Sequence, residues 1–311
     1  MFDVSQEEIT EGSIARTLLT LAAPLVVQNL VQVVQQVVDT FWVGRLSENA
    51  VAAIGLNFPV MALLFSAPIG IFVGTQVLVS QRVGGDDVTG ARRGAFHGVL
   101  LALITGVIIA GVVILGAPNI ISLLSSNPTV SALAVTYLAT VMLGFPLMSM
   151  SDAIEAGFVG WGDSRAALYI NVTAVVVNIG LDPFLIFGYG PFPRLEILGA
   201  GLATALGYSA GFVLAFVLVI RGREGHEYRL TPSSAEVRID DFREVIDIGL
   251  PSAGQNVASQ SVRVVIIGIV AAVGGAAGLA AYTVGARIAS VAFIPANGLQ
   301  QAAQSMVGQN L

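Results

Sequence analysis

The sequence contains no lysine and no cysteine, and only 11% of its 311 residues are charged. Without cysteine there is no disulfide, no thiol nucleophile and no cysteine-ligated metal. Without lysine there is no Schiff base and no phosphate-binding P-loop lysine. The two histidines, His97 and His226, are isolated in the sequence, so neither a metal site nor a catalytic triad is indicated. We therefore expect no enzyme activity, no cofactor, no ATP binding and no nucleic-acid partner.

Hydrophobic residues, by contrast, make up 55% of the sequence, and the mean hydropathy is +0.83. Such a chain is too apolar for an ordinary soluble domain. Five runs contain no Asp, Glu, Lys or Arg, namely 17–38, 49–81, 94–151, 166–181 and 197–220. A membrane-spanning helix needs only about 20 predominantly apolar residues. The first twelve residues contain acids and no base, unlike a secretory signal. The sequence therefore predicts an all-α integral membrane protein in a lipid bilayer, with its first helix retained.

Glycine, proline, asparagine and charged residues divide the apolar runs into eight predicted helices, near 14–43, 51–82, 95–116, 129–158, 165–188, 197–220, 245–274 and 277–307. The run 94–151 is expected to break at GAPN (116–119) and again at SSNP (125–128). With a cytoplasmic N-terminus, the outer segments hold only Arg45 and Arg194. The inner segments then hold Arg16, Arg82, Arg92, Arg93, Arg165, Arg221, Arg223, Arg229, Arg238 and Arg243. The positive-inside rule thus predicts a multi-pass protein of the plasma membrane with a cytoplasmic N-terminus.

An internal repeat divides the chain. Pro251, Gln255 and Asn256 each lie 227 positions after Pro24, Gln28 and Asn29. Because six predicted helices precede the restart, both halves begin on the same side and are expected to be parallel repeats. We predict an N-lobe of six helices (1–220), a charged cytoplasmic linker (221–244) and the first two helices of a C-lobe (245–311). A repeated half would need about four more spans, so the chain is expected to be truncated.

Two aspartates, Asp39 and Asp182, stand inside long apolar runs. A carboxylate at membrane depth costs at least ~2.5–3.5 kcal/mol, so such residues are usually functional. Asn178 precedes Asp182 by one helical turn, and Thr204 reaches a comparable depth. These oxygen-bearing side chains suit H⁺ or Na⁺. As alternatives, Asp39 caps the outer end of its helix and Asp182 starts a turn, while amide and hydroxyl groups serve only helix packing.

Three further positions are candidates for a role in transport. Pro24 lies inside the first helix, removes a backbone hydrogen bond and is a candidate hinge. Arg263 and Arg287 lie inside the predicted seventh and eighth helices. These two arginines are expected either to line a cavity or to pair with acids on helices outside the chain. Gln28 is also expected to line the cavity.

Other residues receive a structural interpretation. Asp152 and Glu155 lie toward the inner end of the predicted fourth helix and are expected at the membrane interface. Trp42 and Trp161 fall near helix ends and indicate interface anchors. Two glycine pairs with a spacing of four allow close helix contact: Gly70 with Gly74, and Gly207 with Gly211.

Several motifs together resemble one transporter family. They are AAPLVVQNLVQVVQQVVDTFWVGRL, AVAAIGL, GTQVLVSQRVGGDD, GWGDSR, NVTAVVVNIGLDPFLIFG and GAGLATA. The sequence is similar throughout to multidrug and toxic compound extrusion (MATE) transporters, and its two aspartates resemble the prokaryotic DinF-type branch. The resemblance implies two six-helix lobes around a V-shaped cavity. It also implies a cation site in the N-lobe at Asp39, Asn178, Asp182 and Thr204, with Pro24 as the bending point. Ala258 and Ser259 stand where NorM-like members carry an acid, so no C-lobe cation site is implied there.

The expected function is export of cationic or amphipathic small molecules by an antiporter coupled to H⁺ or Na⁺ and working by alternating access. One alternative is a flippase for a lipid or lipid-linked sugar, which should have a more cationic cavity. A less favoured alternative is a passive channel.

Overall fold

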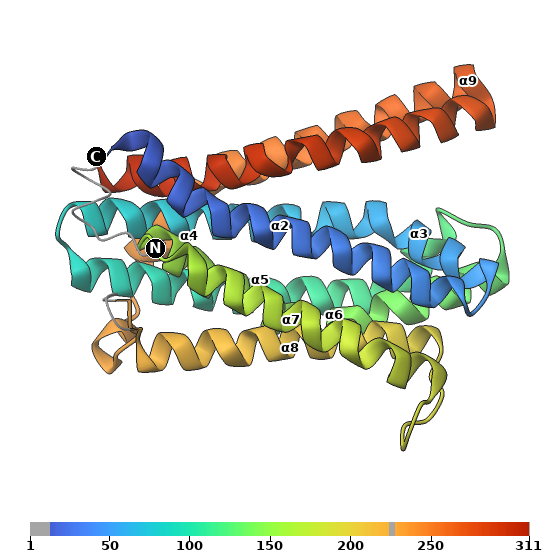
Figure 1. Ribbon diagram of the computed structural model, residues 1–311, viewed down its shortest axis with the longest axis horizontal. Coiled ribbons are helices and arrows are strands. Elements are labelled where there is room, and N and C mark those ends of the chain that lie inside the picture. The colour runs from blue at the N-terminus through green and yellow to red at the C-terminus, as the bar shows by residue number, and fades with distance from the viewer. Residues whose placement is uncertain (1–12, 224–227, 311) are drawn as a thin grey trace.

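The computed structural model describes residues 13–223 and 228–310. Its helices are α2 (Ile14–Gly44), α3 (Glu48–Leu64), α4 (Ser66–Gly84), α5 (Val88–Ser122), α6 (Pro128–Gly160), α7 (Ser164–Phe187), α8 (Ile197–Arg221), the 3₁₀ helix η1 (Pro232–Ala235) and α9 (Ile239–Gln309). The long helices lie side by side in a bundle (Figure 1). Five of them, α2, α5, α6, α7 and α8, are long and apolar enough to cross a membrane, and α3 with α4 forms a sixth, bent span. The predicted all-α membrane architecture is confirmed over these residues.

Polar residues between the apolar runs determine where several helices begin. Asn127 accepts hydrogen bonds from the backbone N–H groups of Thr129 and Val130, and Pro128 occupies the first position of α6. Asp87 and Asp163 cap α5 and α7 in the same way. Each cap satisfies a backbone donor that has no partner within its helix.

Two predicted boundaries are wrong, and proline explains the first. The predicted helix 51–82 is two helices, bent by 41°, because the Pro68 ring cannot accommodate the carbonyl of Leu64 in a continuous helix. In contrast, α5 continues through Pro118 to Ser122, so the GAPN sequence does not end a helix. The break between α5 and α6 falls at the SSNP sequence alone.

The two predicted C-terminal helices are assigned as one element, α9. Gly249 and Gly308 nevertheless both pack against α4, at Gly70 and Ser80 respectively. These two α4 positions are about 15 Å apart along the helix axis, whereas a straight helix from 249 to 308 would extend about 90 Å. The chain therefore reverses direction within α9, and its orange and red parts lie together in Figure 1. The glycine- and alanine-rich sequence at the reversal contains no proline to end the helix.

Glycines set the distance between α4 and α9. A Cβ atom at Gly70 would lie 2.8 Å from the Ala253 Cβ, and one at Gly74 would lie 2.1 Å from the Val245 carbonyl oxygen. A Cβ atom at Gly207 of α8 would similarly lie 2.7 Å from the Ala174 carbonyl oxygen of α7. The predicted role of these glycines in close helix packing is confirmed.

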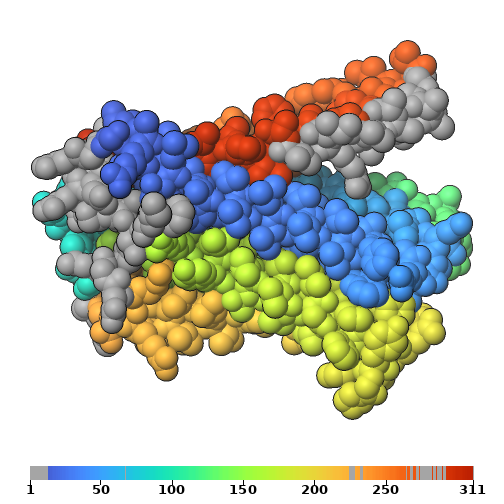
Figure 2. Space-filling model, in the orientation of Figure 1, coloured from blue at the N-terminus to red at the C-terminus, as the bar shows by residue number. Residues whose placement is uncertain are grey.

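The bundle has two unlike ends. We call the end where α4 joins α5 and α8 joins α9 the linker end. There a small apolar cluster closes the bundle: Leu21, Ala22, Leu25, Val159, Ala167 and Ala302. Ser305 and Gln309 of α9 also donate hydrogen bonds to the Val159 and Gly160 carbonyls, at 2.6 and 2.8 Å. At the opposite end α9 stands away from α2 and α3 (Figure 2). The bundle is therefore closed at the linker end and parted at the other.

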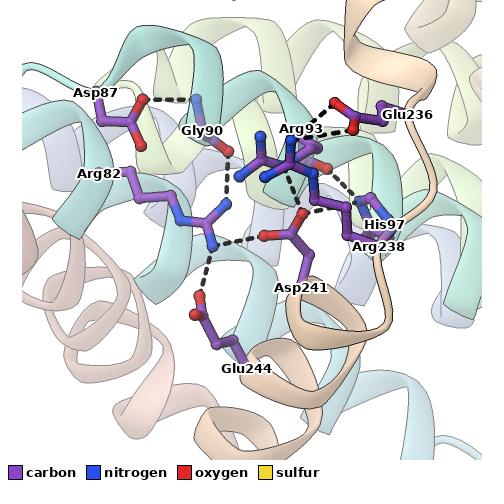
Figure 3. A network of polar contacts seen from close by, with 9 residues as sticks. All are labelled: Arg82, Asp87, Gly90, Arg93, His97, Glu236, Arg238, Asp241 and Glu244. Atoms are coloured by element: carbon purple, nitrogen blue, oxygen red, sulfur yellow. Dashed lines mark hydrogen bonds and ion pairs between the residues drawn. The ribbon is translucent and has the colours of Figure 1, made fainter.

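A polar network fastens the start of α9 to α4 and α5 (Figure 3). Arg82 of α4 and Arg93 of α5 both bind Asp241, whose exposed fraction is 3%, and Arg82 also binds Glu244. Burial raises the pKa of the Asp241 carboxyl, but the hydrogen bonds from Arg82 and Arg93 outweigh burial, so its pKa lies below the ordinary value.

His97 and Trp161 also hold this linker. The His97 Nε2 accepts the Arg238 backbone N–H at 2.9 Å, so its proton lies on Nδ1, which donates to the Arg93 carbonyl at 2.8 Å. Trp161 is 8% exposed and stacks on Tyr228 with ring centroids 4.8 Å apart. Its prediction as a membrane-interface anchor is therefore wrong, because the linker covers the end of α6.

We expect Asp241→Asn to destabilise the fold by about 3 kcal/mol, the lower end of the range for breaking a buried ion pair, because Arg82 and Arg93 would lose their shared counter-charge. The depressed pKa of Asp241 gives the sign of the pH dependence. Its contribution is complete at neutral pH and is lost as the pH falls below about 4. Thermal unfolding of the purified protein in detergent, measured between pH 7 and pH 3, tests both statements.

Arg243→Gln is the matched control, because the Arg243–Asp247 pair is largely exposed and should contribute little. Equal melting temperatures for Asp241→Asn and the control would contradict the assigned role of Asp241.

Candidate functional site

A cavity of about 750 Å³ lies among α2, α3, α4, α6, α7, α8 and α9. Its charged lining residues in the described part of the chain are all acidic: Asp39, Asp152 and Glu155. Most other polar lining residues are amides: Gln28, Asn29, Gln32, Gln35, Gln36, Asn57, Asn171, Asn178, Gln255, Asn256, Asn297, Gln300, Gln301 and Gln304. The described lining therefore offers both hydrogen-bond donors and hydrogen-bond acceptors, and its charged groups are all negative.

Four predicted site residues meet at one level of this cavity. Asp39 of α2 and Asp182 of α7 are close enough for a hydrogen bond between their carboxyl groups. Asp182 and Asn178 are each 1% exposed, and Thr204 of α8 is 6% exposed. Helical spacing brings Asn178 and Asp182 to the same face of α7. Asp39, Asn178 and Thr204 line the cavity, whereas Asp182 is buried next to Asp39 and is not among the lining residues.

The Asn178 amide connects these groups, and its orientation follows from the neighbouring charge. In one orientation its oxygen accepts from the Gln35 Nε2 at 2.7 Å. In the other, its nitrogen donates to the Asp39 Oδ1 at 3.1 Å and its oxygen accepts from the Thr204 backbone N–H at 3.2 Å. A carboxylate requires donors, so the second orientation is the one that stabilises an ionised Asp39.

One oxygen of the Asp182 carboxyl group lacks a hydrogen-bond partner among the described residues. This oxygen, Oδ2, is buried. Two adjacent carboxylates in an apolar bundle repel each other, and a proton or a small cation between them would remove the repulsion and supply the missing partner. In the described part of the chain no group of three or more His, Asp or Glu residues forms a transition-metal site.

Pro24 and Gln28 lie on the same helix as Asp39. α2 continues through Pro24, which leaves the Thr20 carbonyl without its usual helical partner. Gly298 of α9 packs closely against Val26 just beyond this proline. Gln28 lines the cavity as predicted, and its Nε2 donates to the Glu155 Oε2 at 3.0 Å.

Of the two predicted arginines, the structure describes the side chain of Arg263 alone. Arg263 is exposed and is not a lining residue, so the structure gives no support to a cavity role. The Arg287 side chain lies outside the described residues. Pairing of these arginines with acids elsewhere stays a prediction.

Asp152 and Glu155 were predicted at the interface, and this is wrong. Both line the cavity, and Glu155 is 4% exposed. α6 extends to Gly160 and its end is covered by Tyr228, so these acids lie under protein rather than at a membrane surface. The spacing of Met148, Asp152 and Glu155, by four and then three residues, places them on one helical face. This pattern was the signal in the sequence that could have identified them.

The sequence of this chain matches the sequence model of a known protein family. The sequence model of the MatE family matches residues 24–184 and 251–311. The chain belongs to the MatE family. The two matched segments begin at Pro24 and Pro251, the prolines that the internal repeat pairs.

Individual relatives agree with this assignment. A protein named FAD transporter from Shewanella oneidensis is 30% identical, over 97% of this chain and 66% of that protein. A probable multidrug resistance protein NorM from Thermotoga maritima is 27% identical, over 98% and 64%. The solved structure of an outward-facing multidrug resistance MATE transporter of the MOP superfamily has a TM-score of 0.88 at 25% identity, covering 99% of this chain and 67% of that one. The chain thus spans about two thirds of the length of these MATE proteins.

We expect Gly207→Ala to destabilise the site by about 1–3 kcal/mol, because the added methyl group would press on the Ala174 carbonyl and the Asn178 Cβ, 2.7 and 2.9 Å from the new Cβ. Gly180→Ala is the matched control. It lies in α7 two residues from both Asn178 and Asp182, and nothing lies within 4 Å of its added Cβ, so stability should be unchanged or rise by about 0.4–1 kcal/mol. Melting temperatures in detergent measure both, and equal shifts would contradict the packing assigned to Gly207.

Proposed function

We propose that this MATE chain belongs to a cation-coupled exporter of cationic, amphipathic small molecules. The observation that carries the proposal is the acid-only cavity, in which the carboxyl groups of Asp39 and Asp182 lie side by side. Negative charge in a cavity of low dielectric favours cations and disfavours anions. The proposal makes the protein a transporter and not an enzyme.

The coupling ion, H⁺ or Na⁺, would bind at Asp39, Asn178, Asp182 and Thr204. A ligand shifts a conformational equilibrium only if it binds the two states differently. Binding at this site would neutralise repulsion between α2 and α7. Since α2 also carries Pro24 and packs against α9 beside it, a change in α2 would alter its contact with α9. In this proposal, that coupling is the basis of alternating access.

We also propose the lobe organisation and membrane orientation. The N-lobe (1–220) and the start of the C-lobe (245–311) would be joined by the 221–244 linker. The linker end would face the cytoplasm, because Arg82, Arg93, Arg223 and Arg238 gather there. The membrane would be the plasma membrane.

Flippase and FAD-transporter activities are less well supported. A lipid-linked sugar and FAD both carry phosphate groups, for which arginine or lysine is the usual protein partner. The described cavity lining contains neither. Similarity to the protein named FAD transporter therefore does not lead us to propose that substrate for this chain.

The test is ethidium efflux from vesicles that contain the protein, with proton and sodium gradients imposed separately. One of the two gradients should drive efflux. Asp39→Asn and Asp182→Asn should each reduce gradient-driven efflux by at least about tenfold, or ~1.4 kcal/mol, because an amide cannot release a proton or balance the charge of Na⁺.

Asp240→Asn is the control, since it removes one exposed acid outside the cavity and should leave efflux unchanged. Efflux that needs neither gradient, or that survives both cavity substitutions, would overturn the proposal and favour a channel or flippase.

A further inference from the structure

A second acidic pair lies deeper in the cavity. Asp152 and Glu155 are one turn apart on α6, and their carboxyl groups interact electrostatically. The pair sits near the linker end: Glu155 is five residues before the end of α6, or about 7 Å. Its level on α2 is marked by Gln28, which is bonded to Glu155. From Gln28 to Asp39 is eleven residues along α2, or about 16 Å. The two acidic pairs are therefore separate places in one cavity.

Among the described residues, no positively charged side chain neutralises the inner pair. Glu155 is 4% exposed, and in the described part of the chain its carboxylate accepts a side-chain hydrogen bond from the Gln28 amide alone. No described arginine or histidine lines the cavity beside either acid. A buried carboxylate without a counter-charge is strongly unfavourable. Such an acid is stabilised either by a proton or by a positively charged group that enters the cavity.

Amide groups beside the pair give an independent indication. The Gln28 Oε1 and the Asn171 Oδ1 are buried and accept no hydrogen bond from the described residues. Asn171 is seven residues into α7, about 10 Å from the same end of the bundle, and lines the cavity with Gln28. Both atoms are acceptors, so the ligand that suits them carries N–H or O–H donors.

We infer that Asp152 and Glu155, with the amide oxygens of Gln28 and Asn171, bind the protonated amine of the exported compound, while the Asp39–Asp182 pair holds the coupling ion. A protonated amine supplies both the positive charge that the carboxylates require and the N–H donors that the amide oxygens lack. A quaternary ammonium group supplies only the charge. The inference rests on the proposed export of cations and adds a location and a ligand class to it.

The experiment compares three dansylated probes that differ only at the tail: a dimethylaminopropyl amine, protonated at pH 7, its trimethylammonium analogue, and an uncharged isopropyl analogue. Fluorescence titration of the purified protein in detergent gives the dissociation constants. The wild-type protein should bind the protonated amine at least about tenfold more tightly than the quaternary probe, because only the tail of the protonated amine donates a hydrogen bond. The uncharged probe should bind most weakly.

Glu155→Gln should weaken binding of the protonated amine by at least about tenfold, reduce its preference over the quaternary probe, and leave the uncharged probe unaffected. Asp152→Asn should act in the same direction. Asp240→Asn, an exposed acid, is the control and should change none of the three constants. Asp39→Asn should keep the preference for the protonated amine over the quaternary probe.

Equal wild-type binding of the amine and the quaternary probe would overturn the inference, and this comparison needs no substitution that could disturb folding. An unchanged amine constant in Glu155→Gln would overturn it as well. The two proposals can fail separately. Gradient-driven efflux with amine binding indifferent to Glu155 would refute only the inner site, and selective amine binding without gradient-driven efflux would refute only the exporter.

Discussion

A carboxyl group inside an apolar helix bundle needs a hydrogen-bond donor, a proton or a cation beside it, and this requirement governs how the bundle is arranged. Asp39, Asp182, Asp152 and Glu155 each come from a helix that is otherwise almost free of charge. Amide side chains from α2 and α7 surround them because an amide can donate to a carboxylate without adding a charge. In the part of the chain that the structure describes, the cavity between these helices is consequently lined by polar and acidic side chains and by no arginine.

The arginines are instead concentrated at the linker end, where their ion pairs stabilise the packing of the helices. Arg82 and Arg93 bind Asp241, and Arg223 binds Asp163, which also caps α7. These contacts join helices that are adjacent in space but distant in sequence. They hold the start of α9 against α4, while at the other end of the bundle the part of α9 where the chain reverses stands apart from α2 and α3 (Figure 2). Over the described residues, the bundle that holds the cavity is therefore closed at the linker end and parted at the other end.

The two acidic pairs divide the cavity into two levels. Asp39 lies on α2 and Asp182 lies on α7, so the charge of this pair directly affects the contact between these two helices. The Asp152–Glu155 pair lies within one helix, α6, so its charge state bears on what the cavity holds. In the two proposals above, binding of the coupling ion and binding of the exported compound, which have different physical requirements, are thereby placed on different helices of one MATE chain.

The sequence alone determined the class of the protein and most of its helices, because membrane insertion requires long apolar runs and caps or prolines between them. It also determined the meeting of Asp39, Asn178, Asp182 and Thr204, since the resemblance to MATE proteins and the depth of each residue agreed. It could not place Asp152 and Glu155, because their distance from a helix end does not reveal that Tyr228 and the linker cover that end. Nor could it foresee that Trp161 is buried or that His97 bonds to Arg238. Those facts depend on which helices and loops pack together, and only the tertiary structure decides that packing.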